Sequence, residues 1–336
     1  MEKRMTERAS RQYDLIKVVT TLLVVTAHAA RMYTGEGVVR PYNESPFLAQ
    51  LCDIIYAFHM PLYICVSGMV YGLCIDDYGK YEDTAAFLKN KFVRLMIPYL
   101  FFGIAYVAPV MVLFHFTDKS YFSYCVNGIL LVRDSRHLWF LVVLLEIFCV
   151  CAVMKKQIQK KGPIGIFFVL IILSAATWKL PNFLQIKRMI HYLLPFYLGY
   201  VINRNYETVT NLLKKLPVMA LMTVLFLLAY LSEKGGVLPI DGMIITSAAG
   251  IGLITGIVQY VNLDIFRSKW LKRAGKNGFG IYLFHPMIIY LLFYYFGGYD
   301  IAPGLLCGTI IFISYAASWI LTEIIRKVPL KIVIGE

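Results

Sequence analysis

Three ionisable side chains share one helical face of the first apolar stretch, DLIKVVTTLLVVTAHAA. Each helical residue turns by ~100°, so the eleven-residue spacing from Lys17 to His28 brings these two side chains within about 20° of each other and ~16 Å apart. Asp14 lies on the same stripe. A histidine suits a general base and a lysine binds anions. The stripe predicts a reaction centre with an anion site; alternatively, Asp14 and Lys17 reach the headgroups and His28 bonds a neighbouring helix.

Composition places this stretch in a membrane. Of 336 residues, 59% are hydrophobic and 16% are charged, and the mean hydropathy is +0.66. A hydrocarbon core of ~30 Å needs about 20 apolar residues per helix. We therefore predict an all-α, polytopic bundle of about ten transmembrane helices in the cell membrane. The predicted spans lie near 14–34, 47–72, 93–115, 137–154, 164–178, 190–203, 216–232, 243–261, 277–297 and 304–325.

Basic residues predict the orientation of these spans. With both termini cytoplasmic, 23 of the 33 lysines and arginines fall in inner segments, nine fall outside and Lys17 lies within a span. We expect residues 1–12 to form a cytoplasmic tail and residues 1–336 a single membrane-embedded domain. The net charge of +13 is spread over these loops, which favours membrane lipids as partners and argues against nucleic acid.

Two other interpretations of the sequence are weaker. Ala27-His28-Ala29 after an apolar run has the form of a signal-peptide cleavage site, but nine further spans need the first one for their orientation. The seven cysteines show neither a C-x-x-C pair nor metal-ligand spacing, so we expect no metal.

Two carboxylates in other spans lie at depths that match His28. Asp53 lies in the second span and Glu146 slightly deeper in the fourth. A carboxylate beside a histidine fixes its tautomer and stabilises its imidazolium form, so either residue is a candidate partner of the base. A structural hydrogen bond between helices is the alternative for both.

Further ionisable residues form two more groups. His59 and His285 each precede a proline by one or two positions, which suits the wall of a substrate cavity, although each histidine could simply cap the other's kink. Lys91 and Arg94 share a face at the start of the third span, where they could hold phosphates or only flank the membrane.

Several short blocks in order along the chain resemble the type-3 membrane acyltransferases, the bacterial O-acyltransferase family. FHMPL and a first-helix lysine make the chain most similar to the fucose 4-O-acetylase-like branch. The resemblance implies acyl transfer from cytoplasmic acyl-CoA, usually acetyl-CoA, to hydroxyls of cell-surface carbohydrates or glycolipids, with His28 essential. Many members have arginine where this chain has Lys17. Lysine has the same charge but lacks the planar guanidinium group that binds a phosphate through two parallel hydrogen bonds. The blocks are Asp14-x-x-Lys17 with His28, Phe58-His59-Met60-Pro61-Leu62 with Ser67-Gly68, Arg94-Leu95 with Pro98-Tyr99, Leu138-Trp139-Phe140-Leu141, Phe196-Tyr197-Leu198-Gly199-Tyr200 and Gly280-Ile281-Tyr282-Leu283-Phe284-His285-Pro286.

Applied to the residues, this resemblance suggests a mechanism. The anionic head of coenzyme A would bind Lys17, Lys91 and Arg94, and the thioester would reach His28, which removes the proton of an acceptor hydroxyl entering from outside. An acyl-histidine intermediate is the rival mechanism. Trp139 suits either a sugar-stacking surface or the interfacial aromatic belt.

Two other functional classes stay open. Ten spans with intramembrane charges and prolines also suit a transporter or flippase, although no inverted repeat is visible. The chain could instead be a membrane partner in a larger surface-polymer complex, with a degraded site. A homodimer is a further candidate assembly.

Overall fold

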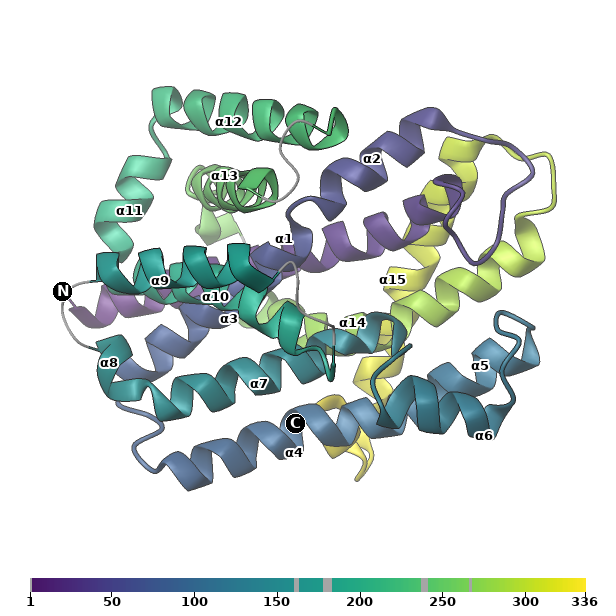
Figure 1. Ribbon diagram of the computed structural model, residues 1–336, viewed down its shortest axis with the longest axis horizontal. Helices are drawn as coiled ribbons and strands as arrows, with labels where there is room; N and C mark the ends of the chain where they lie inside the picture. The colour runs from purple at the N-terminus through teal and green to yellow at the C-terminus, as the bar shows by residue number, and fades with distance from the viewer. Residues whose placement is uncertain (1, 160–162, 178–182, 237–240, 266–267) are drawn as a thin grey trace.

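The computed structural model describes residues 2–159, 163–177, 183–236, 241–265 and 268–336, and these residues form helices and loops without a strand (Figure 1). The main helices are α1 (Glu2–Ala30), α2 (Pro46–Tyr56), α3 (His59–Gly72), α4 (Thr84–Phe102), α5 (Ala108–Leu113), α7 (Trp139–Val153), α9 (Pro163–Ala176), α10 (Ile186–Arg204), α11 (Tyr206–Leu213), α12 (Leu216–Lys234), α13 (Asp241–Val258), α14 (Ser268–Phe296) and α15 (Pro303–Lys327). Short helices are α6 (Tyr121–Ser123), α8 (Lys155–Gln159), and the 3-10 turns at Arg31–Tyr33, Arg136–Leu138, Leu263–Ile265 and Lys331–Ile334.

The all-α, polytopic prediction is confirmed. In the described chain, seven helices are long and apolar enough to cross a membrane, and two shorter apolar helices cover Ile164–Ala176 and Ile244–Val258. The remaining predicted span, 190–203, lies on α10. The long helices are Thr6–Tyr33, Pro46–Asp77, Thr84–Leu113, Arg136–Val153, Leu216–Lys234, Lys269–Phe296 and Pro303–Lys327.

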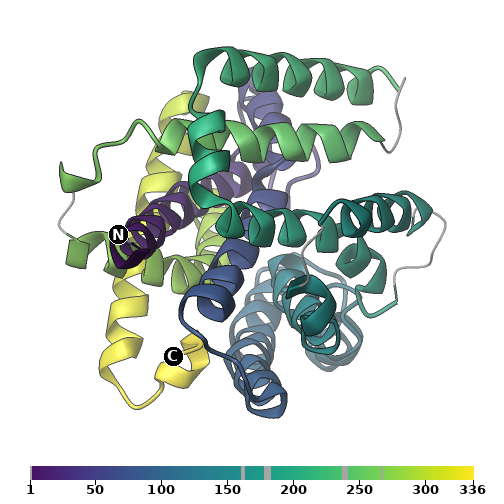
Figure 2. The same ribbon diagram turned by 90° about the vertical axis from the view of Figure 1, so that its left-hand side faces the viewer.

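Helix α1 lies at the centre of the arrangement. It contacts α2, α3, α14 and α15, and both views show it passing through the middle of the bundle (Figures 1 and 2). Helices α12 and α13 lie side by side at one edge, with α11 leading into them, and α13 contacts α3. The predicted stripe of Asp14, Lys17 and His28 therefore lies on a helix that is contacted by several others.

The second span is interrupted next to His59. Pro61 has no backbone N–H, so it cannot bond the carbonyl of Ala57, and α2 ends just before α3 begins. The Ser247 hydroxyl donates to the Ala57 carbonyl instead, at 3.3 Å. His59 Nδ1 lies 2.9 Å from the carbonyl of Ile55. Side chains therefore bond the carbonyls of Ile55 and Ala57 at the break, and His59 is buried within the bundle.

A glycine contact holds α3 against α10. A Cβ on Gly68 would lie 1.9 Å from the Phe196 carbonyl oxygen, and a Cβ on Gly199 would lie 1.9 Å from the Cys65 carbonyl oxygen. Such distances leave no space for any side chain, so two backbones meet here, as at small-residue interfaces of membrane helices.

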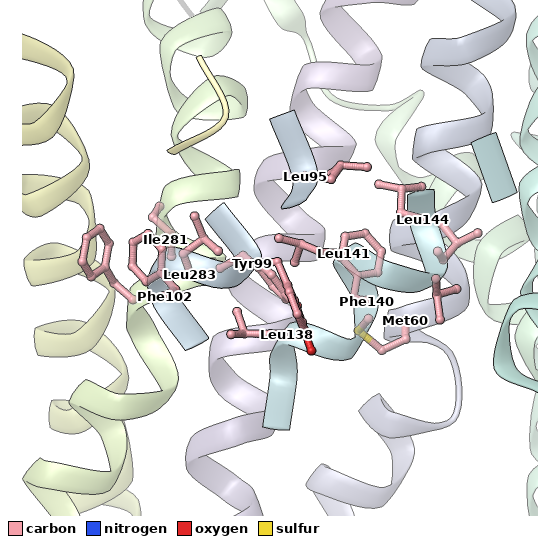
Figure 3. Packing of buried hydrophobic residues seen from close by; sticks show 14 of the residues in the cluster. Met60, Leu95, Tyr99, Phe102, Leu138, Phe140, Leu141, Leu144, Ile281 and Leu283 are labelled. Carbon is pink, nitrogen blue, oxygen red and sulfur yellow. The ribbon is translucent and has the colours of Figure 1, made fainter. Parts of the chain in front are cut away.

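Apolar side chains fill the space between α3, α4, α7 and α14. Figure 3 shows Met60 close to Phe140, and Tyr99 and Phe102 near Ile281 and Leu283. Phe102, Ile281 and Leu283 are completely buried (0% exposed). This core fixes the relative positions of the helices that carry the site.

The contact between α3 and α10 predicts that alanine is destabilising at Gly68 but not at Gly308, a helical glycine outside this contact. Gly68→Ala should lower the thermal midpoint in detergent markedly, because an added methyl group must push α3 away from the α10 backbone. Gly308→Ala on α15, where nothing lies within 4 Å of the added Cβ, should leave it unchanged or raise stability by up to about 1 kcal/mol. Equal stability of the two variants in a thermal unfolding measurement would contradict the contact.

Candidate active site

His28 lies near the C-terminal end of α1 and forms a hydrogen bond with a second histidine. Its Nδ1 atom is 2.7 Å from Nε2 of His285 on α14. The two rings stack with centroids 4.9 Å apart and an interplanar angle of 29°. His285 is completely buried (0% exposed), whereas His28 is half-buried. The sequence analysis grouped His285 with His59 and not with His28; the structure brings it to His28.

The hydrogen bonds determine the tautomer of both rings. His285 Nδ1 lies 2.8 Å from the Ile281 carbonyl, which only accepts, so this nitrogen carries the proton. In a neutral His285 ring, Nε2 is then an acceptor, and His28 Nδ1 must be the donor. The remaining nitrogen of neutral His28, Nε2, has no proton. His28 is therefore held in the tautomer that a general base requires.

A cavity of about 490 Å³ adjoins His28, within the roughly 300–1,000 Å³ range of small-molecule sites. We call it the outer cavity, after the predicted orientation. Its walls combine histidines, arginines and aromatic rings. They include His28, Arg31, Tyr56, His59, Asp134, Arg136, His137, Trp139, Arg188 and Tyr282.

His59 and His137 line the outer cavity with His28, whereas His285 does not, and all three bond to backbone carbonyls. His59 and His285 each bond a carbonyl four residues earlier in sequence, Ile55 and Ile281, rather than one on the other's helix. His137, at the start of the fourth span, lies 3.2 Å from the Leu283 carbonyl through Nε2. Sequence reasoning missed His137, although a histidine directly before the Leu138-Trp139 block was a visible signal.

Trp139 lines the outer cavity, as a substrate contact would. Its ring centroid lies 5.4 Å from that of Tyr192, and the Arg188 guanidinium lies 4.8 Å from the ring centroid. Tyr192 and Arg188 both belong to α10, so Trp139 connects α7 to α10 at the cavity wall.

The two carboxylates expected beside His28 lie elsewhere. Asp53 pairs instead with Lys234 at the end of α12. Glu146 lies on α7 and belongs to neither cavity of this site; its buried Oε2 has no hydrogen-bond partner in the described chain. The geometry thus gives His28 a histidine as its orienting partner, where sequence reasoning expected a carboxylate.

A second cavity of about 510 Å³, the inner cavity, contains the three cations expected to bind an anion. Lys17, Lys91 and Arg94 all line it, and Lys17 pairs with Asp14 at 2.9 Å. Lys91 Nζ lies 4.2 Å from the ring centroid of Phe148. Three further lysines, which the sequence analysis had assigned to topology alone, also line this cavity: Lys80, Lys272 and Lys276.

The C-terminal residues close one side of the inner cavity. The Gly335 carbonyl accepts a hydrogen bond from Arg94 Nε at 2.8 Å, and Glu336 pairs with Arg326 and Lys276. Burial alone raises the pKa of Glu336, but the hydrogen bonds from these two cations outweigh it and hold the pKa below its ordinary value. Asp14 and the ionised Glu336 leave four of the six cavity cations uncompensated.

Three aromatic rings separate the two cavities. Tyr63 and Phe140 line the inner cavity and Tyr282 lines the outer one. The centroid of Phe140 lies 5.1 Å from that of Tyr63 and 5.4 Å from that of Tyr282. We call these three residues the aromatic partition. The cation-lined inner cavity and the outer cavity of His28 therefore lie on either side of these three rings.

Helix α1 presents Lys17 to a cation-lined cavity and His28 to a second cavity, which is compatible with a transferase that binds two substrates at separate sites. The chain belongs to the acyltransferase 3 family, whose model, described as an acyltransferase domain, matches residues 11–323. It is thus a membrane acyltransferase; the match identifies the family and not a branch within it. No curated protein and no solved structure matches the chain.

The tautomer argument predicts different effects of two His285 replacements. His285→Phe removes the acceptor for His28 Nδ1, and we expect kcat for acyl transfer to fall about 10²–10⁴-fold with little change in KM. His285→Gln offers a side-chain oxygen in its place and should recover part of this loss.

Thermal midpoints of both variants provide the control. A role in folding alone would predict that the loss of activity follows the loss of stability. Equal kcat values for the two variants would contradict the assigned role of His285 as a positioning residue.

Proposed function

We propose that the protein transfers an acyl group, most simply acetyl, from cytoplasmic acyl-CoA to a hydroxyl of a cell-surface carbohydrate at the cell membrane. The observation that carries this proposal is the unprotonated Nε2 of His28 in a half-buried ring at the outer cavity, on the same helix that presents Lys17 to the inner cavity. Family membership supports the acyl chemistry; donor and acceptor are part of the proposal.

The reaction balances with His28 as the only proton carrier. His28 Nε2 removes the hydroxyl proton of the acceptor while the oxygen attacks the thioester carbonyl. The carbon–sulfur bond then breaks, and the leaving thiolate takes the proton back from the imidazolium. An ester and free coenzyme A result, and the base returns to its neutral tautomer.

The inner cavity suits the phosphorylated head of coenzyme A. Six lysines and arginines line it, and charge-assisted hydrogen bonds from such groups to phosphate are among the strongest in proteins. The distance of ~16 Å along α1 from Lys17 to His28 is of the order of the extended pantetheine arm. The arm would have to pass the aromatic partition, so donor binding includes a displacement of Tyr63, Phe140 or Tyr282.

An acyl-histidine intermediate is the rival mechanism, and kinetics separate the two. In direct transfer, both substrates must be bound before coenzyme A leaves, whereas a covalent intermediate gives ping-pong kinetics. The two cavities lie on opposite sides of the partition, so donor and acceptor can be present together, which favours direct transfer.

His28→Ala should abolish acyl transfer in liposomes supplied with labelled acetyl-CoA and a panel of envelope glycans. His191→Ala is the matched control, because His191 bonds Ser174 and lines neither cavity. We expect the control to keep its activity. Full activity of His28→Ala would remove the catalytic assignment, and solute uptake without acyl transfer would favour a transporter.

Arg94→Gln should raise the donor KM about tenfold or more, the size of one hydrogen bond to a charged group, and leave the acceptor KM unchanged. Lys327→Gln, at the end of α15 and outside the inner cavity, is the control. Steady-state kinetics with both substrates varied measure the two constants. A rise in the acceptor KM alone would place the donor elsewhere.

A further inference from the structure

The outer cavity is unusually rich in arginine. Four arginines line it, and they come from separate parts of the chain: Arg31 follows α1, Arg133 and Arg136 precede α7, and Arg188 lies on α10. The lining carboxylates are Glu36 and Asp134, which leaves an excess of two positive charges.

The two carboxylates compensate these arginines only in part. Asp134 is shared, with Arg136 Nε at 3.3 Å and Lys119 Nζ at 3.4 Å. The Glu36 side chain is 76% exposed where it meets Arg31 at 3.3 Å, and exposed pairs of this kind contribute little. Among the described residues, neither Arg133 nor Arg188 lies in an ion pair.

Arg188 is held in place without a carboxylate. Its guanidinium lies 4.8 Å from the Trp139 ring centroid, and Nη1 donates to Gln185 Oε1 at 2.9 Å. A guanidinium has five N–H donors, so most of its hydrogen-bonding capacity stays available. The cation is positioned on an aromatic surface at the wall of the cavity that His28 also lines.

Membrane topology does not explain these cations. In the predicted orientation they lie on the outer side, where short loops contain few lysines and arginines. Five arginines are expected outside, and four of them line this one cavity. Arginine is also the side chain whose planar fork matches carboxylate and phosphate groups.

We propose that the acceptor is an anionic carbohydrate, whose carboxylate or phosphate binds at Arg188 and Arg133 while a hydroxyl of the same molecule faces His28. This inference rests on the proposed function, because it names the substrate of that site. A cavity lined by a surplus of one charge concentrates ligands of the opposite charge, so the anion also increases the rate of encounter.

Binding without donor tests this directly. The protein in phosphatidylcholine nanodiscs is titrated with trigalacturonate and with its methyl ester, which has the same hydroxyls without the charge. N-acetylglucosamine 1-phosphate and N-acetylglucosamine form a second pair, which separates a carboxylate from a phosphate as the recognised group. We expect at least one acid to bind about tenfold or more tightly than its neutral counterpart, and the preference to fall at high ionic strength.

Arg188→Gln and Arg133→Gln should each reduce this preference severalfold, and Arg188→Lys should retain part of it. Arg40→Gln, an exposed outer arginine that does not line the cavity, is the matched control and should leave the preference unchanged. An acid preference that survives in the double variant Arg188→Gln/Arg133→Gln overturns the inference, as does equal binding of acid and neutral form in both pairs.

The result is independent of the proposed acyl transfer. Selective binding of an acid by a protein that transfers no acyl group would remove the proposed function and leave the anion site. His28-dependent acyl transfer to neutral sugars without any preference for an acid would remove only the anion site.

Discussion

The hydrogen bond between His28 and His285 is the constraint on which the site depends. It joins α1 to α14. It determines the tautomer of His28 only because the Ile281 carbonyl keeps the proton of His285 on Nδ1. Its length requires the two helices to approach closely and in one register. A Cβ on Gly278 would lie 2.7 Å from the Thr21 hydroxyl oxygen, so a small residue at this contact is part of the same requirement.

Sequence reasoning succeeded for features that helical periodicity alone determines, namely the helical spans and the relative positions of side chains on one helix. The angle between Lys17 and His28 follows from one helix, and the described residues of the ten predicted spans are mostly helical. Lys17, Lys91 and Arg94 also line one cavity, because the ends of neighbouring spans that are predicted to share the cytoplasmic side lie at similar depth. Asp53 shows a limit of this reasoning. Its predicted depth matches that of His28, but depth does not determine towards which neighbour a side chain points, and Asp53 pairs with Lys234.

His285 and His137 show a different limit. Pro286 led us to place His285 in a substrate-cavity wall or, alternatively, at a kink, and it does bond its own helix at Ile281. Its second nitrogen, however, meets a side chain 257 positions away in sequence, and no local pattern predicts such a contact. The grouping of four arginines in one cavity was not predicted for the same reason, because they come from separate segments that only tertiary packing brings together.

A histidine as the orienting partner has a consequence for the chemistry. A carboxylate would fix the tautomer of His28 and also supply a negative charge to its imidazolium form, whereas neutral His285 supplies orientation alone. In the proposed reaction, the positive charge that forms on His28 therefore receives no balancing charge from its hydrogen-bond partner. The developing oxyanion would then be a negative charge formed next to His28, which couples proton removal to attack on the thioester. Under the proposed mechanism, His28 stays neutral and the acceptor keeps its proton until the acyl group of the donor has passed the aromatic partition.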